Sequence, residues 1–325
     1  MSLTRFVNVS TVNNLLKKGI INKEGVRLLD CSYNVSQKLD WKQFEKELYG
    51  KFEVLNSLKT PSKKLYLSGH IPNAVHMSLD AAMYPSKYER FSIYPPEVFQ
   101  EYMQLLGINR DEHLILYGRG ALGGMMFPAR LAWLLKSYGH EKISLIDGGF
   151  GQWQNNGFEV ATDDVKLKAG DWEAKDKIKE HVIKFEELEE KDGNEKAFIE
   201  KTDENNFLDS RGRAQFEGLE DTGLDNYKVS GSHIPGFKNT PSVELLTKDG
   251  LMKSDSEIKK WGLSNGLIEG QPVIINCNTG MQASLLSYAI EDTFSGPKPR
   301  VYNGSLKEME ARDPKKISAG RVHLP

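Results

Sequence analysis

The sequence predicts an α/β protein built from two tandem copies of one unit, each a small parallel sheet flanked by helices. Two observations lead to this prediction. Four blocks of sequence occur twice in the same order, and within each copy short apolar runs alternate with helix-like stretches. The length agrees, because 325 residues are about twice the common size of a domain.

The repeat consists of four pairs of blocks, and chance would not keep four pairs in order. We infer that one ancestral unit was duplicated and that the first copy carries a longer insertion between its first two blocks. The pairs are VRLLDCS (26–32) with NFLDSR (206–211), GHIPNAVHMSLD (69–80) with SHIPGFKNTP (232–241), HLILYGRGALGG (113–124) with PVIINCNTGMQA (272–283), and ISLIDGGFGQW (143–153) with PRVYNGSLKEM (299–309).

The apolar runs at residues 114–116, 143–146 and 273–275 predict strands. Residues 10–16, STVNNLL, predict a capped first helix. A second helix is predicted within residues 128–139, PARLAWLLKSYG, because its large apolar side chains fall on one face: Leu131, Leu134, Leu135 and Tyr138. Nearly continuous apolar strands that alternate with helices are typical of a parallel sheet covered on both faces.

Residues 162–182 are charged and have no extended apolar period, which predicts a linker. The expected domains are therefore residues 1–161 and residues 183–325. The insertion in the first copy, residues 39–69, is amphipathic in part. It suits either an interaction element or a surface helix, and the sequence leaves its role open.

Composition excludes several classes of partner. The 43 basic residues nearly balance the 45 acidic ones, so we expect no nucleic acid. No window approaches the roughly 18 apolar residues of a membrane helix, so we expect no membrane insertion. No secretory signal is recognisable, and we expect a cytoplasmic protein. The first twenty residues hold basic but no acidic side chains, so a weak mitochondrial presequence is the alternative.

The chain has two cysteines, which exclude a disulfide framework, and no short Cys or His spacing predicts a metal site. Cys277 directly follows the predicted strand 273–275, where ligands bind in a parallel sheet. The loop after it leads into a helix start, whose backbone N–H groups and dipole favour a reactive thiolate. The alternative is a cysteine used only for packing.

The repeat supplies an internal control for this cysteine. Gly118 stands at the position of Cys277, so the first copy is predicted to have the same loop without a nucleophile and to be catalytically silent. Cys31 lies at a strand end in the first copy, and its counterpart is Ser210. We interpret Cys31 as a small buried side chain and Cys277 as the candidate nucleophile.

These motifs resemble the two-domain rhodanese sulfurtransferases, a family that includes thiosulfate sulfurtransferase and 3-mercaptopyruvate sulfurtransferase. The resemblance extends from about residue 26 to residue 309. It rests on LLD and FLDSR, on HIP in both copies, on YGH followed by LIDGGFGQW, and on an active loop of Cys, five residues and Ala at residues 277–283. In their duplicated order these motifs are specific, and they imply two tandem rhodanese-like domains.

The resemblance implies a mechanism. The Cys277 thiolate would take the sulfane sulfur of a small-molecule donor as a persulfide and pass it to cyanide or to a thiol, for which a thioredoxin-like protein is one option. No metal or organic cofactor is implied. Thr279 occupies the position of a serine hydroxyl in mercaptopyruvate enzymes, with loop capping as its structural alternative. The remaining loop residues are Asn278, Gly280, Met281, Gln282 and Ala283.

Departures from the family bear on the donor. Asn278 and Thr279 are neutral, whereas thiosulfate-type enzymes have two cations there, so 3-mercaptopyruvate is the expected donor and thiosulfate the second choice. The two arginines that clamp the carboxylate in mercaptopyruvate enzymes align with Gln215 and, approximately, Asn226. Neither residue can form a charged fork.

Nearby cations are the expected substitutes in substrate binding: Arg213 and Lys228. The family's acidic residue on the first domain's side matches Asp80, whereas the histidine that accompanies it aligns with about Arg90. We expect structural roles for three other polar residues of the motifs: Arg211, paired with an acid of its domain, and His70 and His233 in the paired HIP turns.

Two other functions compete with sulfur transfer. A cysteine phosphatase of related fold needs an arginine that closes a loop one residue longer, and the residues after Met281 are Gln282, Ala283 and Ser284. A non-enzymatic scaffold or sulfur-relay partner would suit the missing arginines and the unusual Gln282.

Overall fold

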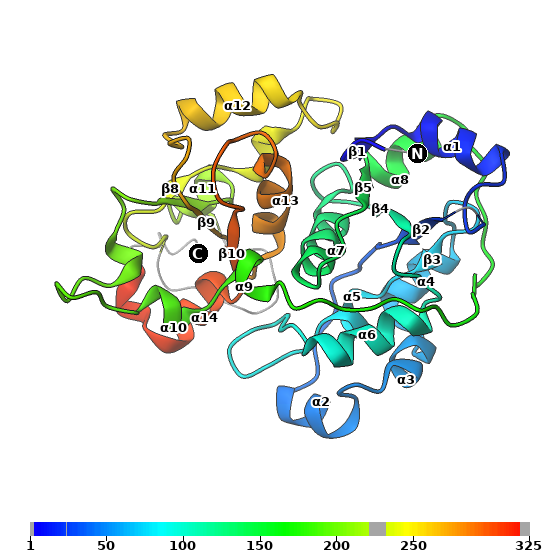
Figure 1. Cartoon of the computed structure of the whole chain (residues 1–325), viewed down its shortest axis with the longest axis horizontal. Coiled ribbons are helices and arrows are strands. Elements are labelled where there is room, and N and C mark those ends of the chain that lie inside the picture. The colour runs from blue at the N-terminus through cyan, green and yellow to red at the C-terminus, as the bar shows by residue number, and fades with distance from the viewer. Residues whose placement is uncertain (1–2, 24, 221–231, 319–325) are drawn as a thin grey trace. The chain divides into compact units, whose positions relative to one another are not determined.

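The computed structural model describes residues 3–23, 25–220 and 232–318, and the chain forms two compact units (Figure 1). Unit 1 consists of Met1–Pro85, Ile93–Lys177 and Lys248–Met252. Unit 2 consists of Ser86–Ser92, Ile178–Thr247 and Lys253–Pro325. Most of the stretch 162–182 therefore lies in unit 1, and its last residues lie in unit 2.

Each unit contains a parallel sheet of five strands, which confirms the predicted fold class. The strand order is β1-β5-β4-β2-β3 in unit 1 and β6-β10-β9-β7-β8 in unit 2. The two orders are the same once each strand is matched to its repeat partner. The duplication seen in the sequence is thus a duplication of topology.

The sheet of unit 1 is covered on both faces. One face packs against α1 and α8 through a core that includes Val12, Ile115 and Trp153. Helix α7 contacts β4 and β5, and α5 and α6 follow it on the other side. The strands are β1 (Phe6–Val7), β2 (Val26–Asp30), β3 (Val75–His76), β4 (His113–Tyr117) and β5 (Ile143–Ile146). The helices are α1 (Val9–Lys17), α2 (Trp41–Glu47), α3 (Phe52–Ser57), α4 (Pro61–Leu67), α5 (Leu79–Ala82), α6 (Pro96–Leu105), α7 (Met126–Ser137) and α8 (Gly149–Asn155).

Unit 2 repeats this arrangement. Helices α10 and α14 pack on one face of the sheet with Phe207 and Ile274, and α13 contacts β9, β10 and α12. The strands are β6 (Val182–Ile183), β7 (Asn206–Asp209), β8 (Lys238–Asn239), β9 (Val273–Asn276) and β10 (Arg300–Tyr302). The helices are α9 (Ile178–His181), α10 (Phe185–Leu188), α11 (Arg213–Phe216), α12 (Asp255–Ser264), α13 (Met281–Ile290) and α14 (Ser305–Arg312), with single 3₁₀ turns η1 (Phe198–Glu200), η2 (Ser242–Leu245) and η3 (Pro314–Lys316).

The predicted strands 114–116, 143–146 and 273–275 are confirmed as parts of β4, β5 and β9. The first predicted helix is α1, which is capped by Asn8, whose side chain accepts a hydrogen bond from the Thr11 N–H. The second predicted helix is confirmed as α7, and its burial extends beyond the one apolar face that predicted it, because every residue from Phe127 to Ser137 is buried. A helix buried all round needs no amphipathic period.

Each unit includes one short segment from the other half of the sequence: Lys248–Met252 in unit 1 and Ser86–Ser92 in unit 2. In unit 1, Asp147 Oδ1 accepts a hydrogen bond of 2.8 Å from the Met252 N–H. In unit 2, Asn303 Nδ2 donates to the carbonyl oxygen of Phe91 over 2.9 Å and to Glu89 Oε1 over 2.8 Å. Asp147 and Asn303 occupy the same place in the repeat, directly after β5 and β10. Each unit therefore uses the same position to hold a segment that is distant in sequence.

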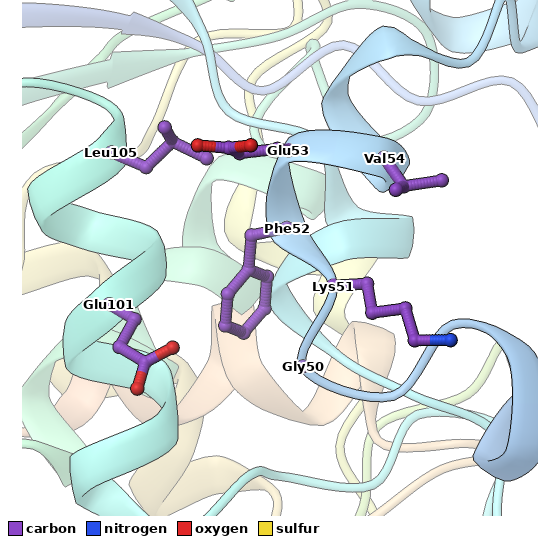
Figure 2. A pocket seen from close by; sticks show the side chains of 7 residues that line it. All are labelled: Gly50, Lys51, Phe52, Glu53, Val54, Glu101 and Leu105. Atoms are coloured by element: carbon purple, nitrogen blue, oxygen red, sulfur yellow. The ribbon is translucent and has the colours of Figure 1, made fainter.

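The insertion 39–69 forms α2, α3 and α4 in unit 1. A pocket of about 420 Å³ lies beside it, lined by the turn before α3 and by α6. Figure 2 shows Phe52, Glu101 and Leu105 around this pocket, with Lys51 and Val54 directed away from α6. Among the helices of the described ranges, none is long and apolar enough to cross a membrane.

Candidate active site

Cys277 stands where the sequence places it, at the carboxyl end of the central strand β9. The side chain is buried, with 2% of its surface exposed. Helix α13 begins four residues later at Met281. Gly280, the residue before the helix, has a left-handed backbone conformation with φ of 80°. The loop 277–280 is therefore a short strand-to-helix turn whose sharp entry depends on a glycine.

Ser305 holds the backbone of the cysteine, and the sequence analysis missed this residue. The Cys277 N–H donates to Ser305 Oγ over 3.2 Å, while the Ser305 hydroxyl donates to the Tyr302 carbonyl oxygen over 2.7 Å. Two backbone bonds join the same segments, from the Leu306 N–H to the Cys277 carbonyl oxygen and from the Lys307 N–H to that of Asn278. The start of α14 thus fixes the loop of the candidate nucleophile.

Ser305 adopts a backbone conformation that suits glycine. Its φ is 52°, and its repeat counterpart Gly149 has φ of 55°. The equivalence extends to hydrogen bonding, because the Phe150 N–H donates to the Gly118 carbonyl oxygen as the Leu306 N–H does to that of Cys277. A non-glycine residue in this region costs about 1–2 kcal/mol, and strain of this kind gathers at functional sites. The fourth pair of blocks had already aligned Ser305 with Gly149, and this was the signal that could have identified it.

Buried polar atoms around Cys277 lack partners. The side chains of Asn276, Asn278 and Thr279 are 0, 3 and 6% exposed. Their side-chain nitrogen and oxygen atoms form no hydrogen bond within the part of the chain that the structure describes. Thr279 therefore does not cap its loop, which removes the structural alternative for its hydroxyl. Because buried polar groups are normally paired, these atoms are available to a bound molecule.

The backbone of the loop adds further donors. The N–H groups in the first turn of a helix have no partner within the helix, and α13 begins with no side-chain cap. These groups carry partial positive charge at the helix start. Together with Asn278 and Thr279 they can stabilise an anionic sulfur near Cys277.

The loop of the first copy differs more than predicted. Gly118 does occupy the position of Cys277, because Asp30 pairs with Tyr117 in the register in which Asp209 pairs with Asn276. However, α7 begins at Met126, so residues 118–125 form a longer loop than residues 277–280. The prediction of the same loop in both copies was therefore wrong. A series of left-handed residues accounts for the extra turn: Gly120, Leu122, Gly123 and Gly124.

The other cysteine is a buried thiol of unit 1. Cys31 is 1% exposed, and its Sγ lies 3.8 Å from the Leu29 carbonyl oxygen. Burial raises the pKa of the Cys31 thiol well above its ordinary value, and the nearby Asp30 raises it further. A thiol in this setting stays protonated and inert. This agrees with the interpretation of Cys31 as a packing residue.

The ion pair expected for Arg211 is confirmed, and His70 and His233 contact backbone carbonyl oxygens. Arg211 forms a buried ion pair with Asp209 and donates to the Ser232 carbonyl oxygen. The His70 ring contacts the carbonyl oxygens of Ile71 and Asp163 through its two nitrogens and stacks on Tyr66. His233 Nδ1 contacts the Phe216 carbonyl oxygen, and the two rings stack at 4.0 Å.

The residues expected to bind substrate lie in both units, and those that the structure describes already have ionic partners: Arg213 in unit 2 and Asp80 in unit 1. Arg213 donates from Nε and Nη2 to the two carboxylate oxygens of Glu244 over 2.7 and 2.8 Å. Asp80 belongs to unit 1, where it pairs with Lys38 Nζ at 2.6 Å. Lys228 and Asn226 lie outside the described residues. Gln215 lies in α11, and Arg90 belongs to the segment Ser86–Ser92 of unit 2.

Within residues 3–23, 25–220 and 232–318, no group of three or more His, Cys, Asp or Glu side chains is arranged to hold a metal ion. The candidate nucleophile at the end of β9 is the Cys277 thiol.

Comparison with known proteins identifies the family. A family model described as "Rhodanese-like domain" matches residues 13–156. A Caenorhabditis elegans protein named "Putative thiosulfate sulfurtransferase mpst-1" is 58% identical over 327 aligned positions and covers 100% of both chains. The 3-mercaptopyruvate sulfurtransferase of Escherichia coli K12 is 30% identical over 250 residues, or 76% of this chain and 82% of the relative.

A solved structure agrees in fold. The crystal structure of the Escherichia coli protein SseA, described as a 3-mercaptopyruvate sulfotransferase with the rhodanese fold, matches 93% of this chain and 99% of its own, with a TM-score of 0.68 and 24% identity. The likeness covers both units, each with its parallel sheet. The chain therefore belongs to the rhodanese family, and it is an enzyme of the sulfurtransferase class.

Proposed function

We propose that the protein transfers a sulfane sulfur from 3-mercaptopyruvate, with thiosulfate as a weaker donor, through a persulfide on Cys277 to a thiol or to cyanide. Unit 2 carries the chemistry and unit 1 is catalytically silent. The observation that supports this most is the buried Cys277 at the end of β9, fixed by Ser305 and surrounded by polar atoms that have no partner among the described residues. The relatives are named for thiosulfate and for 3-mercaptopyruvate, so their names support both donors and do not rank them.

The first half-reaction is an attack of the Cys277 thiolate on the donor sulfur. The new S–S bond forms as the carbon–sulfur bond breaks, and the electron pair of the broken bond stays on carbon. Pyruvate leaves as its enolate, which takes up a proton. Asn278, Thr279 and the N–H groups of the first turn of α13 would stabilise the negative charge on sulfur.

The second half-reaction returns the enzyme to its first state. The acceptor thiolate, or cyanide, attacks the outer sulfur of the persulfide, and the S–S bond breaks with its electrons on Cys277 Sγ. The products are a persulfide of the acceptor thiol, or thiocyanate, and the Cys277 thiolate. A thioredoxin-like protein is one acceptor of this chemistry. Donor and acceptor act in turn at one thiol, so the kinetics are expected to be ping-pong.

The donor preference follows from charge. Asn278 and Thr279 place no cation beside Cys277, and thiosulfate is a dianion that would need one. 3-Mercaptopyruvate carries one carboxylate and a carbonyl oxygen, and the free Thr279 hydroxyl can donate a hydrogen bond to it. A neutral, hydrogen-bonding loop therefore favours the mercaptopyruvate type of donor.

Steady-state kinetics with both donors tests the function. We expect kcat/KM to be higher for 3-mercaptopyruvate than for thiosulfate, Cys277→Ser to lose activity with both, and the matched control Cys31→Ser to keep it. Activity that survives Cys277→Ser, or that disappears in Cys31→Ser with the fold retained, contradicts the assignment.

The substrate-binding part of the proposal concerns Arg213 and Lys228. Arg213 is held by Glu244 in the structure, so its guanidinium would have to bind the donor carboxylate as well as Glu244. We expect Arg213→Ala and Lys228→Ala each to raise KM for 3-mercaptopyruvate, because each variant removes a cation. Unchanged mercaptopyruvate kinetics in Arg213→Ala and Lys228→Ala would remove both cations from the site.

A further inference from the structure

Unit 1 contains a cavity at its own sheet end that the sulfur-transfer reaction does not use. It measures about 370 Å³. It lies beside the loop after β4 and the turn after β5, and Gly250 of the segment Lys248–Met252 also lines it. The carboxyl ends of parallel strands are where ligands bind in open α/β sheets.

Arg119 lines this cavity and is held in place from three sides. Its guanidinium lies 3.7 Å from the centre of the Phe150 ring, Nε donates to Ser32 Oγ over 3.2 Å, and Nη2 donates to the Gly69 carbonyl oxygen. Burial lowers the pKa of Arg119, and the charge of Asp30 opposes that effect. No carboxylate pairs with Arg119 within 4.0 Å in the described part of the chain. A fixed guanidinium without a paired carboxylate suits the carboxylate of a ligand.

Gly151 is a glycine that local structure does not require. It is an exposed residue in the first turn of α8, its φ is not in the left-handed region, and a Cβ built on it would meet nothing within 4 Å. Glycine in a helix is less favourable than alanine. Because neither the backbone nor packing explains this glycine, we attribute it to the cavity that it lines, which a side chain would fill.

Asp249 lines the same cavity and is exposed at its mouth. It does not form an ion pair with Arg119 within 4.0 Å. Asp147 accepts from the Met252 N–H, and Asp30 accepts from the Ser32 N–H through Oδ1, while Asp30 Oδ2 is buried without a hydrogen bond in the described part of the chain. Among the residues that line the cavity, Arg119 is the cation and Asp249 is the anion.

We propose that this cavity binds a free α-amino acid, with the carboxylate of the ligand on Arg119 and its ammonium on Asp249. A ligand with only one of the two charges would leave either Arg119 or Asp249 without a partner inside the site. The side chain would occupy the space that Gly151 leaves open. The proposal concerns unit 1 alone and does not depend on the chemistry at Cys277.

Calorimetric titration of the Cys277→Ser chain tests the proposal, with L-alanine, propionate and ethylamine as probes. We expect saturable binding of L-alanine and binding of the two singly charged probes weaker by about tenfold or more. Arg119→Met and Asp249→Asn should each weaken L-alanine binding by a similar factor. Arg119→Lys, which keeps the charge but loses the fork, should also weaken it, and it replaces Arg119→Met if that variant fails to fold.

Two glycine variants test the open volume of the cavity without changing its charges. Gly151→Leu should abolish L-alanine binding with an unchanged or higher Tm, because it fills the cavity without meeting other atoms. Gly193→Leu, in unit 2 and also in open space, is the matched control and should bind as the parent does. The proposal is overturned if L-alanine does not bind saturably, if Gly151→Leu binds it normally, or if propionate binds as tightly as L-alanine.

Discussion

Cys277 and Ser305 work as a pair at the residue scale. The serine accepts the N–H of the cysteine and keeps a left-handed backbone in which its repeat counterpart is glycine. The chain thus maintains a strained residue at the position whose side chain accepts the N–H of the candidate nucleophile. We interpret Ser305 as a positioning residue for Cys277.

Substitution of Ser305 tests this role. Ser305→Ala removes the hydroxyl and keeps the strain, whereas Ser305→Gly removes both. We expect kcat to fall about fivefold in each variant with KM little changed, since one hydrogen bond contributes about 1 kcal/mol. Ser305→Gly should be about 1 kcal/mol more stable to urea than Ser305→Ala. Equal stability of the two, or full activity of either, speaks against the role.

Thr279 provides a second residue-scale prediction. Among the described residues, its buried hydroxyl has no hydrogen-bond partner, so Thr279→Val should leave the free energy of unfolding unchanged or raise it, because it removes an unpaired polar group. We expect kcat/KM for 3-mercaptopyruvate to fall about tenfold through the loss of one hydrogen bond to the donor. A Thr279→Val enzyme with unaltered kinetics would show that the hydroxyl takes no part.

The decisive element is the turn between β9 and α13. Gly280 enters the helix with φ of 80°, and Gly280→Ala should cost about 1 kcal/mol in stability and lower kcat by displacing the loop. Gly212→Ala is the matched control in unit 2, since Gly212 has negative φ and open space around it. Urea unfolding and steady-state kinetics of the Gly280→Ala and Gly212→Ala proteins test this expectation. A Gly280→Ala protein as stable and active as Gly212→Ala contradicts the argument.

The sequence predicts those elements for which one local pattern, such as an apolar run, is strong. Apolar runs located β4, β5 and β9, and with them the strand end that carries Cys277. It did not predict the longer loop 118–125, whose left-handed residues leave no apolar period. It also did not predict the contacts of Arg213 and Ser305, because Glu244 and Cys277 are distant from them in sequence. Tertiary partners of polar side chains are not encoded in local pattern.

For the whole molecule, two buried histidines predict how stability depends on pH. Burial lowers the pKa values of His76 and His140 to about 4 from the ordinary 6.5. The unfolded chain therefore takes up these protons first. Stability is intact above pH 6.5 and falls as the pH drops towards 4, by up to about 3 kcal/mol for each histidine.

Urea unfolding at pH 7 and pH 5 checks this expectation. His76→Gln carries no titrating ring, so its stability should fall less between the two pH values than that of the parent chain. The comparison uses the change with pH in each protein, which removes any constant effect of the substitution. An equal fall in both proteins would mean that His76 does not contribute to acid sensitivity.

The central claim is that sulfur passes through Cys277 of unit 2 and not through unit 1. Mass spectrometry after incubation with 3-mercaptopyruvate, without an acceptor, tests it most directly. We predict an added mass of one sulfur atom, located on the peptide that contains Cys277 and absent in Cys277→Ser, with no addition on the peptide of Cys31. An unmodified Cys277 peptide, or sulfur found on Cys31, would contradict the account.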